Sequence, residues 1–223
     1  MKTTIPKIIH QIWIGKEIPS KFKGFTDKMK EVHEEKGYKH YLWGNEIWEK
    51  YSNDPYIAAY TGKNFPLAYV TDRFRMLLLR DYGGIAVDPD CEIIKSFDNI
   101  LNKLGKEITY FAGVRSKVSM TGALIECGIQ GSAPNSRVVQ ELLTVWDNLE
   151  YAPGGKKTSD KLITILDSDV SLLNHEYFFS YTTNNKTILL HEPHTLDTWR
   201  KGDDRTNMQG RRKQIINSMN VIS

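Results

Sequence analysis

The 223-residue sequence has little of what marks secreted, membrane or zinc-binding proteins. Its two cysteines, Cys91 and Cys127, are too few for a disulfide framework, and no C-x-x-C pattern of a zinc site is present. It has no run of roughly 18 apolar residues, so we expect no transmembrane helix. The opening stretch MKTTIPKIIHQIWIG is interrupted by Pro6 and His10 and lacks a small-residue cleavage site, which argues against a signal peptide. These absences predict a protein of a reducing compartment, the cytoplasm.

Charge of one sign is also scarce, because the net charge is only +3. Residues 200–223 hold six basic and two acidic side chains, so the basic excess belongs to this segment and the rest of the chain is close to neutral. One interpretation is a solvated terminal helix. The other is weak contact with an anionic partner: the inner face of a membrane, a lipid-phosphate-linked acceptor or a nucleic acid. The small size of the charge favours the solvated helix.

The composition that is present is that of an ordinary globular protein, with 40% hydrophobic and 26% charged residues. Its length suits a single domain that spans residues 1–223. Strand-like and helix-like segments alternate, which predicts an α/β fold whose central sheet is mostly parallel, with helices on both faces. We expect strands at 7–14, 38–43, 108–114, 123–129 and 186–191, helices at 20–35, 136–150 and 158–167, and a loop at 153–157.

Residues 67–98 carry the most informative pattern. Apolar side chains recur at helical spacing over residues 67–79 and extend around much of the helix surface, which predicts a largely buried helix. Asp72 and Arg75 lie three residues apart and therefore emerge on the same side of this helix. The glycine pair 83–84 ends the helix, because glycine accepts the left-handed conformation that a helix C-terminus needs.

A short apolar strand, residues 85–87, leads directly into Asp88-Pro89-Asp90. In an extended segment residues i and i+2 point to the same side, so both carboxylates can face one ion. Paired carboxylate oxygens suit Mg²⁺ or Mn²⁺. A polar turn is the alternative interpretation of the tripeptide, and a structural ion pair is the alternative for the two charges on the helix. The succession of both features along the chain favours a functional site.

Three blocks of the sequence resemble a known family. TDRFRMLLLRDYGGIAVDPD resembles the S-D-x-x-R…G-G-x-Y-x-D-x-D core of the DXD-type glycosyltransferases of family 32. IPKIIHQIWIG is similar to the opening strand of that family, and His194 with Trp199 is similar to its C-terminal H-x-x-x-S-W. The family includes the yeast initiating mannosyltransferase, bacterial capsule glycosyltransferases and, distantly, the glucosylating toxins of clostridia. The blocks occur in the family's order and cover most of the chain.

The resemblance implies a GT-A-like, Rossmann-like fold and a metal-dependent hexosyltransferase. The donor would be a nucleotide-diphosphate sugar, with UDP expected and GDP as the alternative. The acceptor would be a polysaccharide, a lipid-linked saccharide or another hydroxyl compound, a nucleic acid included. Members of this family retain the anomeric configuration, usually without an obvious enzyme nucleophile, so we assign none here.

The resemblance also implies catalytic roles for four residues and a metal site for Mn²⁺ or Mg²⁺. Asp90 would be the direct metal ligand, and Asp88 would reach the metal through water or contact the ribose. His194 occupies the position of the family's C-terminal histidine, and Asp197 is a further oxygen candidate. The remaining catalytic pair, Asp72 and Arg75, would hold the donor sugar hydroxyls and the phosphate side.

Further donor contacts are expected from both ends of the chain. Trp199 would donate its indole N–H to the diphosphate, as part of a lid and basic tail formed by residues 193–223. Trp13 would stack on the nucleotide base, with a core tryptophan as the alternative. Ile14 and Gly15 follow the first strand, and ligands in parallel sheets bind at the carboxyl ends of strands. These residues and the acidic motif are therefore expected to share one crevice.

Two other functions remain open from the sequence. The first is a catalytically idle nucleotide-sugar-binding protein that has kept the fold. The second is a metal-dependent phosphohydrolase, which would release phosphate instead of sugar. Retention of carboxylates whose burial costs several kcal/mol argues against the idle protein.

Overall fold

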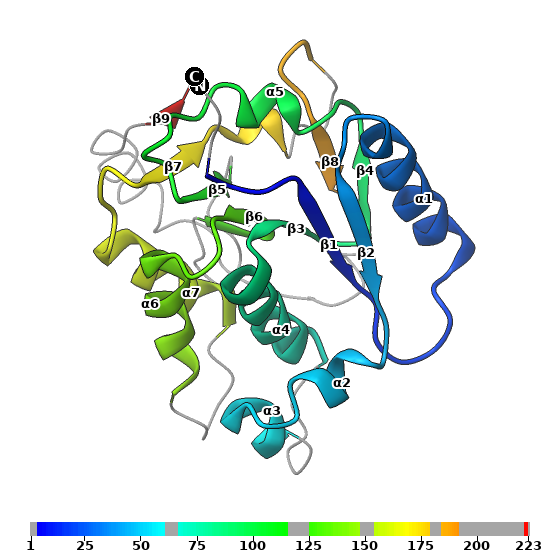
Figure 1. The fold of residues 1–223 in the computed structure, drawn as a ribbon, viewed down its shortest axis with the longest axis vertical. Coiled ribbons are helices and arrows are strands. Elements are labelled where there is room, and N and C mark those ends of the chain that lie inside the picture. The colour runs from blue at the N-terminus through cyan, green and yellow to red at the C-terminus, as the bar shows by residue number, and fades with distance from the viewer. Residues whose placement is uncertain are drawn as a thin grey trace, which may run out of the picture.

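The computed structural model describes residues 4–60, 67–115, 125–147, 154–178, 184–191 and 221–222, with side chains at all of these positions except 154–155, 191 and 221–222. The described residues form a seven-stranded sheet in the order β2-β1-β3-β6-β5-β7-β9 (Figure 1). Its strands are β1 (Ile8–Ile12), β2 (Lys39–Trp43), β3 (Gly84–Val87), β5 (Tyr110–Val114), β6 (Ile125–Ser132), β7 (Val170–Leu173) and β9 (Val221–Ile222). A separate two-stranded sheet pairs β4 (Cys91–Ile93) with β8 (Leu189–His191).

Most neighbouring strands of the large sheet run parallel, as the alternation of strands and helices predicts. β1 is parallel to β2 and β3, and β7 is parallel to β5 and β9. β6 is the exception, because it runs antiparallel to both β3 and β5. This reversed strand lies at the centre of the sheet, directly beside the strand that leads into the acidic motif.

Helices cover both faces of the sheet (Figure 1). They are α1 (Ser20–Glu34), α2 (Ile47–Lys50), α3 (Pro55–Tyr60), α4 (Leu67–Tyr82), α5 (Asp98–Leu101), α6 (Arg137–Leu143) and α7 (Gly154–Thr164), with 3-10 turns at Thr144–Trp146 and His175–Tyr177. Helices α4, α6 and α7 lie over one face, whereas α1, α5 and the small β4-β8 sheet lie over the other. The predicted α/β architecture, mostly parallel with helices on both faces, is confirmed.

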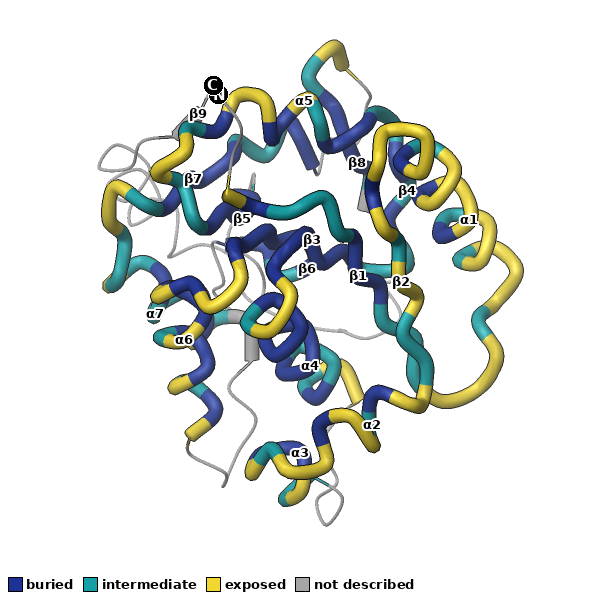
Figure 2. The backbone as a smooth tube through the Cα atoms, in the orientation of Figure 1, coloured by how far each residue is buried: buried dark blue, intermediate teal, exposed yellow. Residues whose placement is uncertain are grey.

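Each face has its own hydrophobic core, and the strands alternate between the two. Ile85 and Val87 of β3 point into the core that contains α1, while Ala86 between them points into the core that contains α4. All three are buried, as Figure 2 shows for the central strands. Burying a large apolar side chain contributes roughly 1.5–3 kcal/mol, so a strand buried on both sides is strongly fixed in register.

The turn from α4 into β3 depends on glycine. Gly83 and Gly84 have φ values of +63° and +97°, which L side chains rarely adopt. A Cβ on Gly84 would lie 2.5 Å from the backbone oxygen of Ile8, because β3 passes close to β1 there. The glycine pair therefore lets the buried helix connect directly to the buried strand.

One predicted loop is wrong. Helix α7 begins at Gly154, inside the segment 153–157 that the sequence suggests is irregular. Lys156 and Asp160 form an ion pair at helical i,i+4 spacing, and Leu162 is buried against α6 and the sheet. This packing outweighs the poor helix propensity of glycine, which amounts to about 1 kcal/mol per residue.

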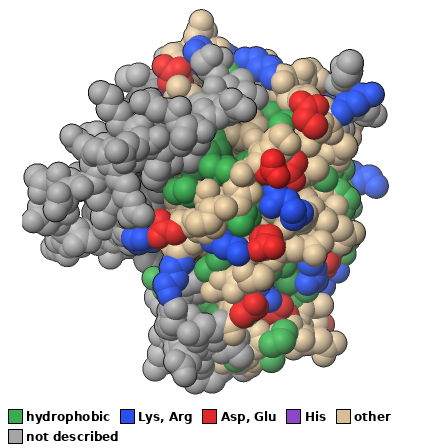
Figure 3. All heavy atoms as spheres, turned by 90° about the vertical axis from the view of Figure 1, so that its left-hand side faces the viewer, with side chains coloured by type: hydrophobic (Ala, Val, Ile, Leu, Met, Phe, Trp, Pro, Cys, Tyr) green, Lys and Arg blue, Asp and Glu red, His purple; other side chains and the backbone are tan. Residues whose placement is uncertain are grey.

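The exposed charges on the side that carries α6 and α7 are mixed in sign. Figure 3 shows acidic and basic side chains interspersed among the described residues of this side. Arg137 pairs with Asp169 at 2.7 Å, and Lys161 pairs with Glu141 at 2.8 Å. Separately, none of the helices within the described ranges is both long and apolar enough to cross a membrane.

Candidate functional site

The acidic motif and the end of the first strand lie at the same edge of the sheet. β1 and β3 are parallel neighbours in which Ile9 pairs with Ile85 and His10 with Ala86. Both chains therefore leave the sheet on the same side, and the Gln11 amide donates to the backbone oxygen of Asp88 at 3.4 Å. Both segments therefore lie at the carboxyl ends of parallel strands, where ligands of such sheets bind, and a crevice shared between them stays a prediction.

The segment after β1 is a structured turn. Gly15 has φ +104° and exchanges two hydrogen bonds with the Asn45 amide, at 2.8 and 3.2 Å. The Trp13 indole N–H donates to the backbone oxygen of Lys16 at 2.8 Å, and its half-buried ring lies 5.8 Å from that of Phe22. Trp13 is thus neither a core residue nor fully exposed. Its stacking on a nucleotide base stays a prediction, as do the contacts expected from Ile14 and Gly15.

Arg75 is the centre of the site. Its guanidinium donates to Asp72 Oδ1 at 2.7 Å, forms an ion pair with Asp88 Oδ1 and donates to the backbone oxygen of Cys127 at 2.5 Å. The Arg75 side chain is 7% exposed, whereas those of Asp72 and Asp88 are 27% and 29% exposed. The buried guanidinium therefore joins the helix carboxylate to the acidic motif, and both carboxylates keep an accessible side.

The electrostatics of this cluster follow from burial and crowding of carboxylates. Burial raises the pKa of Asp72 to about 6, and the negative charges of Asp88 and Glu126 act in the same direction, while Arg75 opposes them. Burial alone would lower the pKa of Arg75, but Asp88 and Asp72 outweigh it, so the pKa is raised and the guanidinium stays charged. The two aspartates outnumber the guanidinium that joins them, and the local charge favours a cation.

Strand β6 supplies contacts that sequence reasoning missed. The Gly128 oxygen accepts the Asp88 N–H at 2.9 Å, and Glu126 is a buried carboxylate that accepts the Gly128 N–H at 2.9 Å. In the sequence, these contacts are indicated only by a glutamate inside an apolar strand. Nothing in the sequence indicates that this strand lies antiparallel beside β3.

The donor set of the site fits a hard divalent cation that keeps open coordination positions. Asp88 Oδ1 is engaged by Arg75, while Oδ2 lies over Gly128, where a Cβ would approach it to 2.8 Å. Asp90 follows two residues later. No cluster of three or more His, Cys, Asp or Glu side chains forms a ready-made cage among the described residues. Two carboxylates suffice for Mg²⁺ or Mn²⁺ when water and substrate phosphates complete the shell.

The C-terminal candidates His194, Asp197 and Trp199 lie outside the described residues, as does all of the expected lid 193–223 except β9. The described chain does come close to the site before them. In β8, His191 pairs with Cys91, the residue directly after Asp90. Residue 194 is therefore only three positions along the chain from a strand that adjoins the acidic motif.

His10 and Cys91 are structural residues of the core. His10 is a core residue, 1% exposed, and its Nε2 lies 2.9 Å from the Gly83 oxygen. Cys91 is fully buried and behaves as a small apolar side chain.

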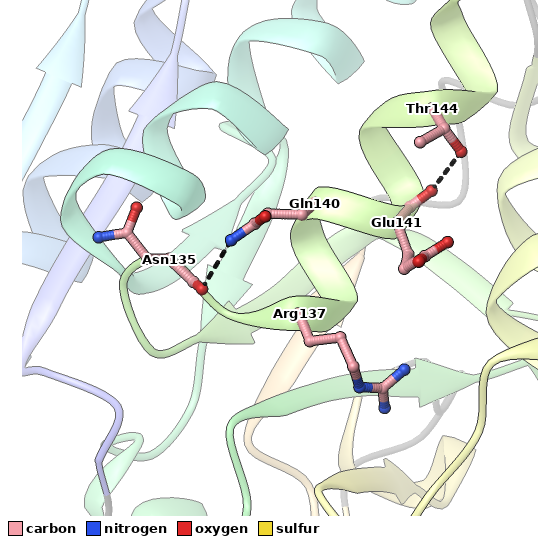
Figure 4. A pocket seen from close by; sticks show the side chains of 5 residues that line it. All are labelled: Asn135, Arg137, Gln140, Glu141 and Thr144. Carbon is pink, nitrogen blue, oxygen red and sulfur yellow. Dashed lines mark hydrogen bonds between the residues drawn. The ribbon is translucent and has the colours of Figure 1, made fainter.

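A shallow hollow of about 450 Å³ lies elsewhere on the surface. It is lined by polar side chains of α6 and the turn before it, among them Asn135 and Gln140, which Figure 4 shows joined by a hydrogen bond. This turn follows Ser132, which pairs with Gly84 at the beginning of β3, whereas the acidic motif follows the end of β3. The hollow therefore belongs to the opposite edge of the sheet.

Comparison with known proteins agrees with this geometry. The family model for the glycosyltransferase sugar-binding region containing a DXD motif matches residues 19–107, which include the four candidate catalytic residues. An uncharacterized glycosyltransferase of Acanthamoeba polyphaga mimivirus is 30% identical over 189 residues, which cover 78% of this chain and 72% of that relative. The chain belongs to the DXD-motif glycosyltransferase family.

Two fungal proteins are similar to the chain over a shorter stretch. The mannosyl phosphorylinositol ceramide synthase SUR1 of Saccharomyces cerevisiae is 29% identical over 100 residues, 44% of this chain and 25% of its own. Inositol phosphoceramide mannosyltransferase 3 of Schizosaccharomyces pombe is 31% identical over 101 residues, with 44% and 28% covered. The chain thus spans about a quarter to a third of the length of these relatives.

Solved structures of glycosyltransferases share the fold. A glycosyltransferase involved in glycosylation of the major capsid of PBCV-1 aligns with a TM-score of 0.56 at 10% identity, covering 94% of this chain and 99% of its own. The PaToxG glycosyltransferase aligns with a TM-score of 0.52 at 19% identity, with 72% and 69% covered. These likenesses show that the DXD-motif chain has the GT-A-type α/β fold expected from its sequence.

Proposed function

We propose that this chain is a metal-dependent glycosyltransferase that moves a hexose-type sugar from a nucleotide-diphosphate donor to a hydroxyl acceptor with retention. The observation that carries the proposal is Arg75, which joins Asp72 and Asp88 at the edge where two parallel strands end. A buried charge cluster at this edge is costly unless its charges are used or fully paired. Here the carboxylates outnumber the guanidinium and keep accessible sides.

Mn²⁺ or Mg²⁺ would be held by Asp90 directly and by Asp88 through water, or with Asp88 on the ribose. His194 and Asp197 would complete the protein ligands. The bound cation would neutralise the leaving diphosphate. The support for this assignment is the donor set of two carboxylates two residues apart, with Asp88 Oδ2 lying over Gly128.

The donor would lie across the ends of β1 and β3. Asp72 would accept hydrogen bonds from sugar hydroxyls, and Arg75 would face the phosphates. Trp13, with Ile14 and Gly15, would contact the base, and Trp199 the diphosphate. We take a UDP-sugar as the first donor to test. A mannosyl donor comes second, because the names of the fungal relatives specify mannosyl transfer.

The acceptor in this proposal is a saccharide or a lipid-linked compound, used in the cytoplasm. The basic residues of the segment 200–223 would give weak contact with the inner face of a membrane. A lipid acceptor is further supported by the fungal relatives, whose names specify inositol phosphoceramide.

A donor screen tests the proposal. The chain is incubated with UDP- and GDP-sugars in the presence of Mn²⁺, and the release of free sugar, nucleoside diphosphate and phosphate is measured. We expect slow metal-dependent hydrolysis that releases sugar and nucleoside diphosphate. Thermal stabilisation by donors without any turnover would instead indicate an idle binding protein, and release of phosphate a phosphohydrolase.

Exchange of Asp72 for Ala tests the sugar contact. A lost hydrogen bond to a charged group costs roughly 1–3 kcal/mol, so the affinity for the whole nucleotide sugar should fall by that amount. The affinity for the bare nucleoside diphosphate should change little, because that ligand has no sugar to hold. Calorimetric titration of both ligands measures the difference. Equal weakening for the two ligands would show that Asp72 only supports Arg75.

A further inference from the structure

β6 has an irregularity beside the site to which the proposed function gives no role. β5 and β6 pair regularly from Tyr110–Ser132 to Ala112–Gln130, after which Gly113 pairs with Glu126. Residues 127–129 of β6 therefore have no partners in β5, and these three residues form a bulge. Bulges redirect side chains and backbone groups and are frequent next to active sites.

The backbone of this bulge holds both charged partners of the site. The Cys127 oxygen accepts from the Arg75 guanidinium at 2.5 Å, and the Gly128 oxygen accepts the Asp88 N–H at 2.9 Å. The Gln130 amide donates to the same Cys127 oxygen at 3.2 Å, which fixes its direction. In a regular strand these successive carbonyls would point in opposite directions along the sheet. Because of the bulge, the Cys127 carbonyl contacts Arg75 and the Gly128 carbonyl contacts Asp88.

Glu126 closes the bulge from the inside. Its residue is 4% exposed, and its Oε1 accepts the Gly128 N–H at 2.9 Å. Its Oε2 forms an ion pair with Arg115 at the end of β5. Both oxygens of this buried carboxylate are therefore used, one by β6 itself and one by the residue that follows β5. Desolvating a carboxylate costs several kcal/mol, so a buried carboxylate needs hydrogen-bond or ion-pair partners. One partner here is the Gly128 N–H, and this hydrogen bond fixes the backbone of the bulge.

We propose that Glu126 is a positioning residue for the cation and donor site. It fixes the Gly128 peptide, and the bulge carbonyls then fix the Asp88 main chain and the Arg75 guanidinium. The inference rests on the proposed function, because cation binding is what gives the position of Asp88 its importance. Gly128 also contributes to this positioning, since a Cβ there would lie 2.8 Å from Asp88 Oδ2 and displace that carboxylate.

Four variants of the full chain separate the contributions. Glu126→Gln keeps an oxygen that can accept the Gly128 N–H but loses the charge that faces Arg115. Glu126→Ala loses both, and Gly128→Ala moves the Asp88 carboxylate by steric contact alone. Glu141→Gln is the matched control, because it removes a surface carboxylate on α6 that is paired with Lys161.

The first readout is the binding of Mn²⁺ alone, titrated without donor and followed by the EPR signal of the free ion. Loss of a residue that orients a metal ligand typically weakens affinity about 10- to 100-fold, and we expect this for Glu126→Ala and Gly128→Ala. Glu126→Gln should stay within about threefold of the original chain, since the hydrogen bond survives. The control should not change.

The second readout is hydrogen exchange of the Asp88 amide in the metal-free chain, which does not depend on the proposed activity. It should become faster in Glu126→Ala and stay unchanged in Glu126→Gln. A folded Glu126→Ala with the original Mn²⁺ affinity and unchanged exchange overturns the inference. So does a Glu126→Gln variant as weak as Glu126→Ala, because the ion pair with Arg115 would then be the cause.

Two further outcomes are informative. If Glu126→Ala does not fold, the Mn²⁺ affinities of Gly128→Ala and Glu126→Gln test the proposal. An unchanged Mn²⁺ affinity in Gly128→Ala would then contradict it. Where the original chain itself binds no Mn²⁺, the metal dependence of the proposed function is wrong. The exchange of the Asp88 amide still tests the positioning in that case, so the two failures can be told apart.

Discussion

At the scale of single residues, Asp88 and Asp90 are neighbours with different structural surroundings. Asp88 pairs with the buried Arg75, whereas Asp90 Oδ1 lies 4.0 Å from the thiol sulfur of Cys91, which is a weak donor. Their spacing in the sequence does not distinguish their contributions to stability. The structure indicates that their removal will have different consequences for stability.

Asp88→Asn and Asp90→Asn should therefore differ in the free energy of unfolding but not in their effect on donor hydrolysis. Both should abolish most metal-dependent donor hydrolysis. Asp88→Asn should also lower the free energy of unfolding by roughly 1–3 kcal/mol, because it leaves a buried guanidinium with one carboxylate fewer. Asp90→Asn should lower it less, because it leaves the ion pairs of Arg75 with Asp72 and Asp88 in place. Urea unfolding and donor hydrolysis with and without EDTA measure these effects, and full hydrolysis after EDTA treatment would contradict the metal dependence.

His10 makes stability depend on pH. Its Nε2 is 2.9 Å from the Gly83 oxygen, and its Nδ1 accepts from the Trp43 indole at 3.1 Å, so the folded chain holds it neutral. Burial lowers the pKa of His10 from 6.5 to about 4. The unfolded chain consequently binds more protons between these values, and stability falls as the pH falls through that window.

The expected loss from His10 is about 2 kcal/mol at pH 5, given 1.36 kcal/mol per unit of pKa difference. His40, whose pKa burial also lowers to about 4, acts in the same direction. Asp72 opposes them, because its raised pKa of about 6 makes the folded chain bind more protons below that pH. Urea unfolding at several pH values measures the slope, which should be shallower in His10→Gln. An unchanged slope in that variant would rule out the contribution.

At the scale of elements, the passage from α4 to β3 is the critical connection. It sets the direction in which β3 delivers the acidic motif, and it needs a positive φ at both glycines. The glycine pair is therefore required by the backbone, although it lies inside the stretch that carries the candidate catalytic residues.

Gly84→Ala should destabilise the chain, whereas Gly24→Ala should stabilise it. At Gly84 a side chain is strained by the φ of +97° and meets the Ile8 oxygen, at a cost of roughly 1–3 kcal/mol or more. Gly24 lies inside α1, and a Cβ there would have no neighbouring atom within 4 Å, so alanine should add about 0.5–1 kcal/mol. Thermal unfolding of both variants gives the comparison. Equal effects at the two positions would show that the turn is not constrained.

At the scale of the whole molecule, the role of the C-terminal segment stays a prediction. We expect donor and metal together to order residues 193–204 over the site, which would keep water from the sugar. Trp199 fluorescence should then respond to nucleotide plus metal more than to either alone, with Trp199→Phe as the control for the four other tryptophans. A chain that ends before His194 should stay folded, because β9 adds only two residues at the sheet edge. Full turnover by this shortened chain would remove the C-terminal residues from the site.

The sequence alone predicts the helix with Asp72 and Arg75, the glycine turn, the strand and the acidic motif. These signals are local, since helical period, backbone freedom and alternation act over a few residues. It also predicts the mostly parallel architecture, because strands that alternate with helices have few other ways to pack. The folded chain alone shows that β6 runs antiparallel beside β3, and that Arg75 reaches the Cys127 carbonyl 52 residues away. Such contacts depend on sheet order and on a bulge, and neither leaves a periodic trace in the chain.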